Sequence, residues 1–455
     1  MVYPDKYLQI PSWGITIAIN TLFVSWGKIR YQSGPGKGCA DVAQAMGSKQ
    51  KDIKMANHRV ILAALRRYGM LSRSELSEQL SISAPTISKN VDELLLRRVL
   101  IEHGTVATNV GRRPNMLGIN PDYCNVAVVD FSHVETTVAV ANMKGEIVAR
   151  ASVYSGEAID RAHIDQVIRT LQDLLEQGGH LRLLKAISIA TPGLIDTSTG
   201  RFLYAPRFVD YQNINLHSMF AQTFDVEILL KNDISMAALG EALYGAGKGF
   251  NNQLYIYLDH GVGTGLVLDG KLYEGSRGTA GEVGTWMVDP REAYAMFRNG
   301  QSHQSRVLDS EITGHGIRRK VWARLRAGEE SVLSAMLKPE EIPTFSQVVS
   351  GFQVKDPLCR AVVEESAVIF TCILKNLIDF LDVDLVIIGG AVRQFGDAYM
   401  DVVHSYLDAV HPMVMPKLVW SDLQGEAGLH GAVGNSLEYV FEQIVQQTQN
   451  FDGQN

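Results

Sequence analysis

The chain has 455 residues, 46% of them hydrophobic and 20% charged, which is enough for two or three domains that each bury a core. Its four cysteines, Cys39, Cys124, Cys359 and Cys372, form no C-x-x-C pair and have no nearby histidine partner. This spacing indicates neither a disulfide framework nor a zinc cage, and it fits a reducing compartment. We therefore expect a cytoplasmic protein without a bound metal.

The net charge of -7 is divided unevenly along the chain. Residues 57–113 carry nine Lys or Arg against five Asp or Glu, and residues 1–56 carry seven against three, whereas residues 114–455 carry 26 against 41. A basic front on an acidic body is typical of a protein in which only the front approaches the phosphates of nucleic acid.

An apolar run over residues 10–27 raises the question of a membrane segment. Polar residues interrupt it, and Pro11 and Gly14 lie inside it, whereas about 20 predominantly apolar residues are needed to cross a bilayer. No basic segment precedes the run, as a secretory signal would require. We expect no membrane contact and interpret residues 1–54 as a poorly ordered extension.

Residues 55–120 are predicted to form a winged helix-turn-helix. Apolar residues at three- and four-residue spacing indicate a first helix from Asn57, which ends at Gly69. Ser72 is followed three positions later by Glu75, which is a capping box for a second helix through Leu80. Residues 81–83 are then a tight turn.

A third helix is predicted to open at Pro85, since the first helical turn needs no proline N–H, and to continue through Leu95. One of its faces is apolar. A helix with a polar N-terminal face after a short turn is the geometry that places a recognition helix in the major groove of DNA. We predict that the DNA contacts on this segment come from Ser83, Thr86, Ser88, Lys89 and Asn90.

Two further strands, residues 99–102 and 115–119, flank a loop that contains Arg112 and Arg113. This loop is interpreted as a wing, and its paired arginines suit the DNA backbone or a narrow minor groove. The alternatives are a solvated charged turn for the arginines and an ordinary exposed face for the helix. Because one such unit contacts a single half-site of double-stranded DNA, we expect a homodimer or homotetramer.

Beyond residue 121, apolar strands alternate with amphipathic helices, which indicates an α/β fold. The predicted strands are 125–129, 137–141, 186–190, 227–230, 254–258, 264–268 and 385–388, and the predicted helices are 164–177, 236–243, 359–381 and 427–445.

Four motifs occur together in this body. They are the glycine-rich run Gly261-Val-Gly-Thr-Gly265, the element Ala280-Gly-Glu-Val-Gly284, the tripeptide Lys231-Asn-Asp233 at a strand end, and Gly389-Gly-Ala391. Glycines at this density let backbone amides approach a phosphate. From Met55 onward the chain resembles the ROK (repressor, open reading frame, kinase) family, which comprises sugar kinases and kinase-like repressors.

The resemblance implies a two-lobed, actin-like ATPase (sugar kinase-like) body. Its lobes would be residues 121–245, closed by the helix 427–445, and residues 246–426, followed by a disordered tail, 446–455. It also implies sugar contacts from Asn232, Asp233 and Glu282, with Asp233 as the vestigial base that would take a proton from a sugar hydroxyl. Without the neighbouring motifs, a helix N-cap would be the favoured interpretation of Asp233. The remnant of the phosphate-binding loops would be Asp130, Gly261, Gly263, Gly265, Gly389 and Gly390.

The chain departs from the family pattern at two places. The first phosphate loop of the family reads D-x-G-x-T, whereas Ser132 and His133 place Cβ atoms here and Glu135 adds a negative charge. Thr285 stands where the family has a zinc-binding histidine, and residues 286–304 contain no cysteine. We expect weak ATP binding, no cofactor and no metal.

The sequence thus predicts a DNA-binding transcriptional regulator, a repressor of carbohydrate-related genes, whose partners are a double-stranded operator and a sugar or sugar-derived effector. Two alternatives stay open: an active ATP-dependent sugar kinase that carries a DNA-binding front, and a regulator whose body docks another protein in place of a small molecule.

Overall fold

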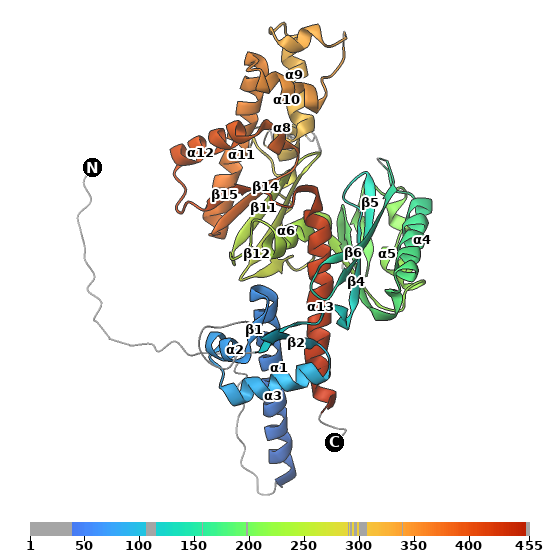
Figure 1. Cartoon of the computed structure of the whole chain (residues 1–455). Coiled ribbons are helices and arrows are strands. Elements are labelled where there is room, and N and C mark those ends of the chain that lie inside the picture. The colour runs from blue at the N-terminus through green and yellow to red at the C-terminus, as the bar shows by residue number, and fades with distance from the viewer. Residues whose placement is uncertain are drawn as a thin grey trace, which may run out of the picture. The chain divides into compact units, whose positions relative to one another are not determined.

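The computed structural model describes residues 39–105, 115–156, 158–196, 199–289, 307–338 and 340–451, with residues 291, 294, 298 and 299 (Figure 1). The predicted wing residues Arg112 and Arg113 lie outside these ranges. The chain divides into two units, residues 1–50 and 51–455. No helix among the described residues is both long enough and apolar enough to span a bilayer.

The front region, residues 51–119, contains three helices and a small sheet of order β1-β3-β2. Its elements are α1 (Cys39–Tyr68), β1 (Leu71–Ser72), α2 (Arg73–Leu80), α3 (Ala84–Leu96), β2 (Leu100–Thr105) and β3 (Asn115–Ile119). The predicted capping box is confirmed, because the Ser72 hydroxyl accepts from the Glu75 amide and the Glu75 carboxylate accepts from the Ser72 amide.

Helix α1 begins at Cys39, so the prediction of a poorly ordered extension is wrong for residues 39–54. Residues 39–56 lack the apolar periodicity that marks a buried helix face, but they are rich in Ala, Gln, Lys and Met. These residues favour a helix by intrinsic propensity, without any need for a core contact.

The first lobe of the body holds a five-stranded sheet of order β10-β7-β4-β5-β6. Its strands are β4 (Asn125–Asp130), β5 (Glu135–Asn142), β6 (Ile147–Tyr154), β7 (Leu184–Thr191) and β10 (Glu227–Asn232). Strands β4, β7 and β10 are parallel, and β5 pairs antiparallel both with β4 and with β6. The lobe also contains α4 (Arg161–Gln177), β8 (Leu194–Asp196), β9 (Arg201–Tyr204) and α5 (Leu216–Ala221).

The second lobe repeats the same topology in the order β13-β12-β11-β14-β15. Its strands are β11 (Gln253–Leu258), β12 (Val262–Leu268), β13 (Lys271–Tyr273), β14 (Leu385–Gly389) and β15 (Lys417–Trp420). Again β11, β14 and β15 are parallel, and β12 pairs antiparallel both with β11 and with β13. Its helices are α8 (Leu308–Ile312), α9 (Gly314–Arg326), α10 (Phe345–Gln353), α11 (Pro357–Leu381) and α12 (Asp397–Val410).

Short 3-10 turns complete the described elements: η1 (Pro121–Tyr123), η2 (Leu181–Leu183), η3 (Tyr211–Asn213), η4 (Val283–Thr285), η5 (Val332–Ala335), η6 (Ala391–Phe395) and η7 (Gln424–Glu426).

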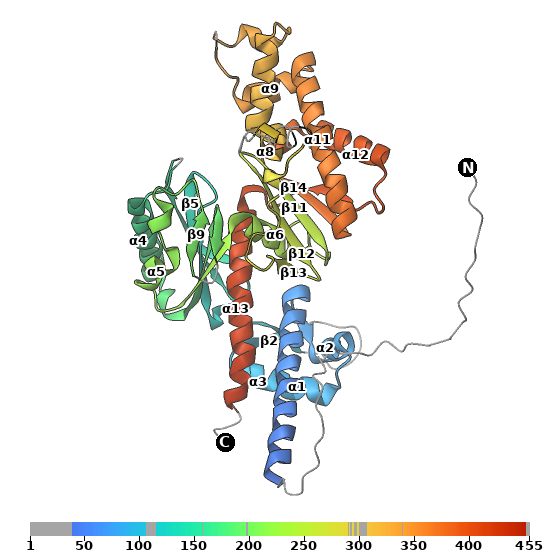
Figure 2. The same cartoon turned by 180° about the vertical axis from the view of Figure 1, so that it is seen from behind.

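Two helices, α6 (Asp233–Tyr244) and α13 (Ala427–Phe451), cross at glycines. A Cβ atom at Gly431 would lie 1.7 Å from the Met236 carbonyl oxygen, and one at Gly240 would lie 2.1 Å from the Ala427 carbonyl oxygen. The two backbones therefore touch directly, at a separation that no larger residue permits. Figures 1 and 2 both show α6 beside the upper part of α13.

Helix α13 also belongs to the core of the front region. Its apolar residues Leu437, Val440, Phe441 and Ile444 form one buried cluster with side chains of α1, α3 and β4. The helix continues to Phe451, so the prediction of a disordered tail from residue 446 is wrong for residues 446–451.

The glycine crossing generates a stability prediction. We expect Gly431→Ala to lower the free energy of unfolding by about 2 kcal/mol or more, because the new methyl group overlaps a backbone carbonyl and the two helices must separate. Urea denaturation followed by circular dichroism measures this loss. Gly104→Ala is the control, since a Cβ there meets nothing within 4 Å; an equal effect of both changes would contradict the close crossing.

Candidate functional site

The site is built where β10 ends and α6 begins. Asn232 is the N-cap of α6: its side-chain oxygen accepts from the amides of Ile234 (3.0 Å) and Ser235 (3.1 Å), and its Nδ2 donates to the Gly193 carbonyl at 3.1 Å. The capping role considered for Asp233 therefore belongs to its neighbour Asn232. Asp233 is the first residue of the helix, and its Oδ1 accepts from the Ile234 amide at 2.9 Å.

A second carboxylate, Asp130 at the end of β4, interacts electrostatically with Asp233. Asp130 is 3% exposed, and its Oδ1 accepts from both the amide (2.9 Å) and the hydroxyl of Ser132. Burial raises the pKa of Asp130. Burial, and then the charge of Asp130, raise the pKa of Asp233 to about 6. The structure thus brings together two predicted site residues as a coupled pair of acids.

Arg207 supplies the cation for this pair. Its Nη1 donates to the carbonyls of Phe131 and Ser132, both at 2.9 Å, and its Nη2 donates to the carbonyl of His133 at 3.0 Å. Burial lowers the pKa of Arg207, and the carboxylates of Asp233 and Asp130 oppose that shift. The sequence analysis missed Arg207, because a lone arginine in a stretch without a motif gives no signal.

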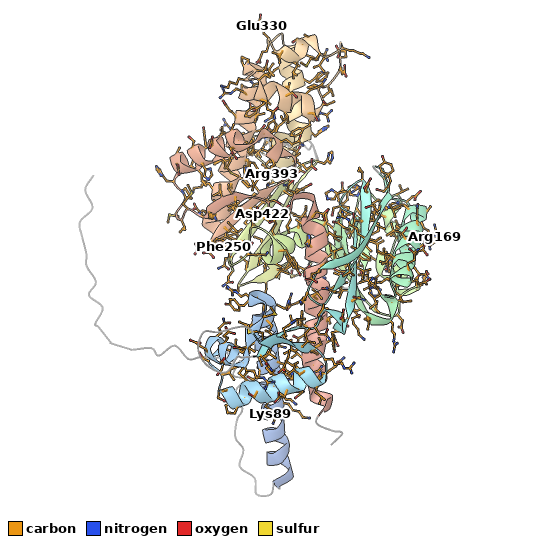
Figure 3. The ribbon with its side chains drawn as sticks, viewed as in Figure 1. Lys89, Arg169, Phe250, Glu330, Arg393 and Asp422 are labelled. Carbon is orange, nitrogen blue, oxygen red and sulfur yellow. The ribbon has the colours of Figure 1, made fainter. Side chains whose placement is uncertain are left out.

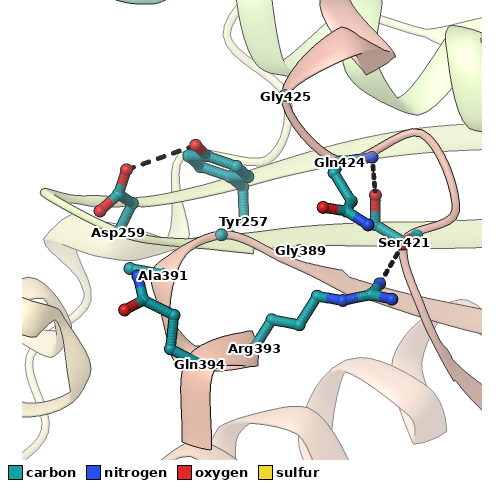
Figure 4. A pocket seen from close by; sticks show the side chains of 10 residues that line it. Tyr257, Asp259, Gly389, Ala391, Arg393, Gln394, Ser421, Gln424 and Gly425 are labelled. Atoms are coloured by element: carbon teal, nitrogen blue, oxygen red, sulfur yellow. Dashed lines mark hydrogen bonds between the residues drawn. The ribbon is translucent and has the colours of Figure 1, made fainter. Parts of the chain in front are cut away.

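Asp130 lines the larger of two cavities, which share Gln424 and Gly425. The predicted sugar contacts Asn232, Asp233 and Glu282 are not among the lining residues of either cavity. The smaller, of about 360 Å³, is lined by the predicted Gly389 and Gly390 together with Tyr257, Asp259, Ala391, Arg393, Gln394 and Ser421. Figure 4 shows how the Tyr257 hydroxyl donates to Asp259, the Gln424 amide donates to the Ser421 hydroxyl, and Arg393 donates to the Ser421 carbonyl.

The larger cavity, of about 450 Å³, has an acidic wall. Four carboxylates line it: Asp130, Glu135, Asp422 and Glu426. Of its basic lining residues, Arg150 pairs with Glu426 at 2.9 Å, and a ring nitrogen of His133 is hydrogen-bonded to the Gly425 carbonyl at 3.0 Å.

The chain segment shared by both cavities is held by a buried acid on α6. Glu241 is fully buried, and its carboxylate accepts from the Ser421 hydroxyl and from the amides of Leu423 (2.9 Å) and Ala246 (2.8 Å). Several donors satisfy the charge, as burial of a carboxylate requires. A charged residue inside an alanine-rich helix was the available sequence signal for this role.

Two glycines of the predicted phosphate loop lie where α6 packs against β12. A Cβ at Gly263 would lie 2.6 Å from the Ile234 side chain, and one at Gly265 would lie 2.4 Å from the Ala238 Cβ. These two glycines let α6 approach β12, which gives them a packing role in addition to the predicted one in a phosphate loop. Gly261 is not among the lining residues of either cavity.

Glu282 is exposed and does not join the acid pair. Its pKa is raised by desolvation and by the charge of Asp309, which itself accepts from the Val262 amide at 2.6 Å. Among the described residues, no group of three or more His, Cys, Asp or Glu is placed to hold a metal ion.

The predicted DNA-facing residues of α3 divide into two sets. Lys89 is exposed (Figure 3) and forms no ion pair with any described residue, while Ser83 is exposed and Thr86 and Ser88 are half-buried. Ser83 and Thr86 share a hydrogen bond between their hydroxyls, at 2.8 Å. Asn90 is only 5% exposed and donates to the Thr86 carbonyl at 2.7 Å, so its prediction as a DNA contact is wrong.

A family model, curated proteins and solved structures were each compared with this chain, and all three relate it to the same family. The ROK family model matches residues 126–435. The xylose repressor of Caldicellulosiruptor bescii is 25% identical over 77% of this chain and 86% of its own length, and the glucokinase of Halalkalibacterium halodurans is 28% identical over 62% of this chain and 84% of its own. Among solved structures, a ROK family transcriptional regulator, a homologue of Escherichia coli MLC, covers 87% of this chain and 98% of its own at 22% identity, with a TM-score of 0.72.

Proposed function

This chain belongs to the ROK family, and we propose that it is a sequence-specific DNA-binding transcriptional regulator, a repressor of carbohydrate-related genes. The front region would be its winged helix-turn-helix DNA-binding domain, and the two lobes would bind a sugar or sugar-derived effector. The observation that carries this proposal is the geometry of α2 and α3, with Lys89 exposed after a tight turn. The similarity to a named repressor over most of both chains supports it.

The DNA-binding surface would be the exposed N-terminal part of α3, with Ser83 and Lys89, and the wing residues Arg112 and Arg113. Lys89 forms no ion pair with the described residues, so its charge is available to a phosphate. We propose a homodimer or homotetramer, since each front region reads one half-site. Mass photometry of the DNA complex measures that stoichiometry, and a single chain per operator would contradict it.

Genome-wide mapping of bound DNA identifies the operator and so permits a direct test. We expect Lys89→Ala to weaken operator binding and to reduce the slope of log affinity against log salt by about one, because one phosphate contact is lost. Fluorescence anisotropy at several salt concentrations measures both quantities. Lys144→Ala, which removes an exposed lysine between β5 and β6, is the matched control. Equal behaviour of the two variants would place the DNA elsewhere.

The proposed effector site lies around Asn232 and Asp233, with Glu282 as a more distant contact. Coupling to DNA would run through α13: residues 424–426, which line the larger cavity, lead directly into this helix, and its far end shares a core with the front region. Such coupling requires that the effector bind two arrangements of the chain with different affinity.

The raised pKa of Asp233 makes sugar binding sensitive to pH. An ionised carboxylate accepts hydrogen bonds from sugar hydroxyls, and protonation below its pKa of about 6 removes acceptor capacity. We expect sugar affinity, and sugar-induced release of the operator, to fall roughly fourfold from about pH 7.5 to about pH 5.5. Calorimetric titration measures the affinity.

In Asp233→Asn the affinity should be lower and independent of pH. Asp225→Asn, an exposed acid just before β10, should keep the dependence of the unmodified chain. A pH dependence that persists in Asp233→Asn would assign it to another group.

A sugar kinase is the second candidate, because Asp233 has the raised pKa of a general base and because a glucokinase is among the relatives. Against it, the Asp130 carboxylate is occupied by its own loop, and Glu135 lines the cavity beside it. We expect no sugar-dependent ATP turnover in a coupled assay with a panel of hexoses and N-acetylated sugars. Clear turnover that Asp233→Asn abolishes would establish the kinase instead.

A further inference from the structure

We propose that the effector is an unphosphorylated sugar, and that the larger cavity rejects sugar phosphates because carboxylates line its acidic wall and because donors of the loop 131–133 are bonded within the protein. This inference rests on the proposed function, because it specifies the chemical class of the ligand that the effector site takes.

The first support is that the loop has few amides left for an anion. Phosphates in proteins are held by converging backbone N–H groups and by Arg or Lys. Here the Phe131 amide donates to the Ala190 carbonyl at 2.9 Å, and the Ser132 amide donates to Asp130 at 2.9 Å. Two successive donors of the loop are therefore already used within the protein.

The second support is the direction of the loop carbonyls. Three of the five N–H donors of Arg207 are bonded to the carbonyls of residues 131, 132 and 133. The carbonyl oxygens of the loop therefore point toward the guanidinium of Arg207, and these hydrogen bonds hold the loop in one conformation. Arg207 is thus a positioning residue, and it is committed to the loop and to the neighbouring acids Asp130 and Asp233.

The third support is the charge of the larger cavity. Its lining holds four carboxylates, and its arginine, Arg150, is paired with Glu426. A phosphate dianion in this cavity would meet the like charges of its lining, among them Asp130 and Glu135, and the lining holds no uncommitted arginine or lysine to neutralise it. A neutral polyol meets no such repulsion, and its hydroxyls suit carboxylate acceptors.

The test compares matched ligands. Xylose, glucose and N-acetylglucosamine, each with its phosphate monoester, are titrated into the full chain by calorimetry, and inorganic phosphate is titrated separately. At least one free sugar should bind, and its phosphate monoester should bind at least tenfold more weakly. A monoester that binds as tightly as its parent sugar, or more tightly, would overturn the inference and leave the proposed regulator intact.

A charge variant separates the acidic wall from other causes. Glu135 is exposed and lines the larger cavity, so Glu135→Lys should keep the fold and should reduce severalfold the ratio between the affinity for the free sugar and the affinity for its phosphate monoester. Glu329→Lys, an exposed change outside both cavity linings, is the control. If the ratio between the two affinities is unchanged in Glu135→Lys, the acidic wall does not cause the rejection of phosphate.

The two proposals fail in different ways. Binding of no sugar and no sugar phosphate, by a chain that still binds its operator, would overturn the sugar effector itself. Binding of phosphate monoesters alone would overturn only the exclusion of phosphate.

Discussion

The contact on which the rest of the structure depends is the crossing of α6 and α13 at Gly240 and Gly431, where backbone meets backbone. Helix α6 begins at the acid Asp233 and carries Glu241, which holds the segment 421–423. Helix α13 follows that segment directly and ends in the core of the front region. Because interiors are close-packed, a shift of one helix at this crossing must be followed by the other. This pair of helices therefore links the segment 421–423 to the front region.

The connection between α13 and the front region is mainly apolar. Two ion pairs cross it, Arg59 with Glu442 at 2.6 Å and Arg66 with Glu438 at 2.7 Å, and the Arg66 guanidinium lies 4.7 Å from the centre of the Phe441 ring. Exposed ion pairs of this kind contribute about 0–1 kcal/mol each. The shared buried cluster contributes more, since each fully buried large apolar side chain is worth about 1.5–3 kcal/mol. The buried cluster thus supplies most of the stability of this connection, and the ion pairs position α13 against α1.

Signals carried by a few neighbouring residues predicted where α2 and α3 begin. Relations between residues far apart in the chain could not be predicted from the sequence. The capping box at Ser72 and the proline at the start of α3 are local, and both elements lie where they were expected. Asn90 was assigned to the wrong face although Ile87, Val91 and Leu94 are buried around it, because a polar residue was taken to mark the exposed side. Strand β6 has an alternating burial pattern rather than an apolar run, and it was missed. Arg207 lies 74 residues from the His133 carbonyl to which it donates, and no spacing rule connects such positions.

Under the proposed function, a kinase-like fold serves as a sensor in place of a catalyst. Phosphoryl transfer relies on donors and cations that position a nucleotide and neutralise its charge. In this chain the amides of Phe131 and Ser132 and the guanidinium of Arg207 are bonded within the protein, whereas the carboxylates of Asp130 and Glu135 line the larger cavity. Acceptors for sugar hydroxyls are thus retained while the donors for phosphate are occupied. In the proposed regulator the effector would be released unchanged, and its binding energy would shift the equilibrium between two arrangements of α6 and α13.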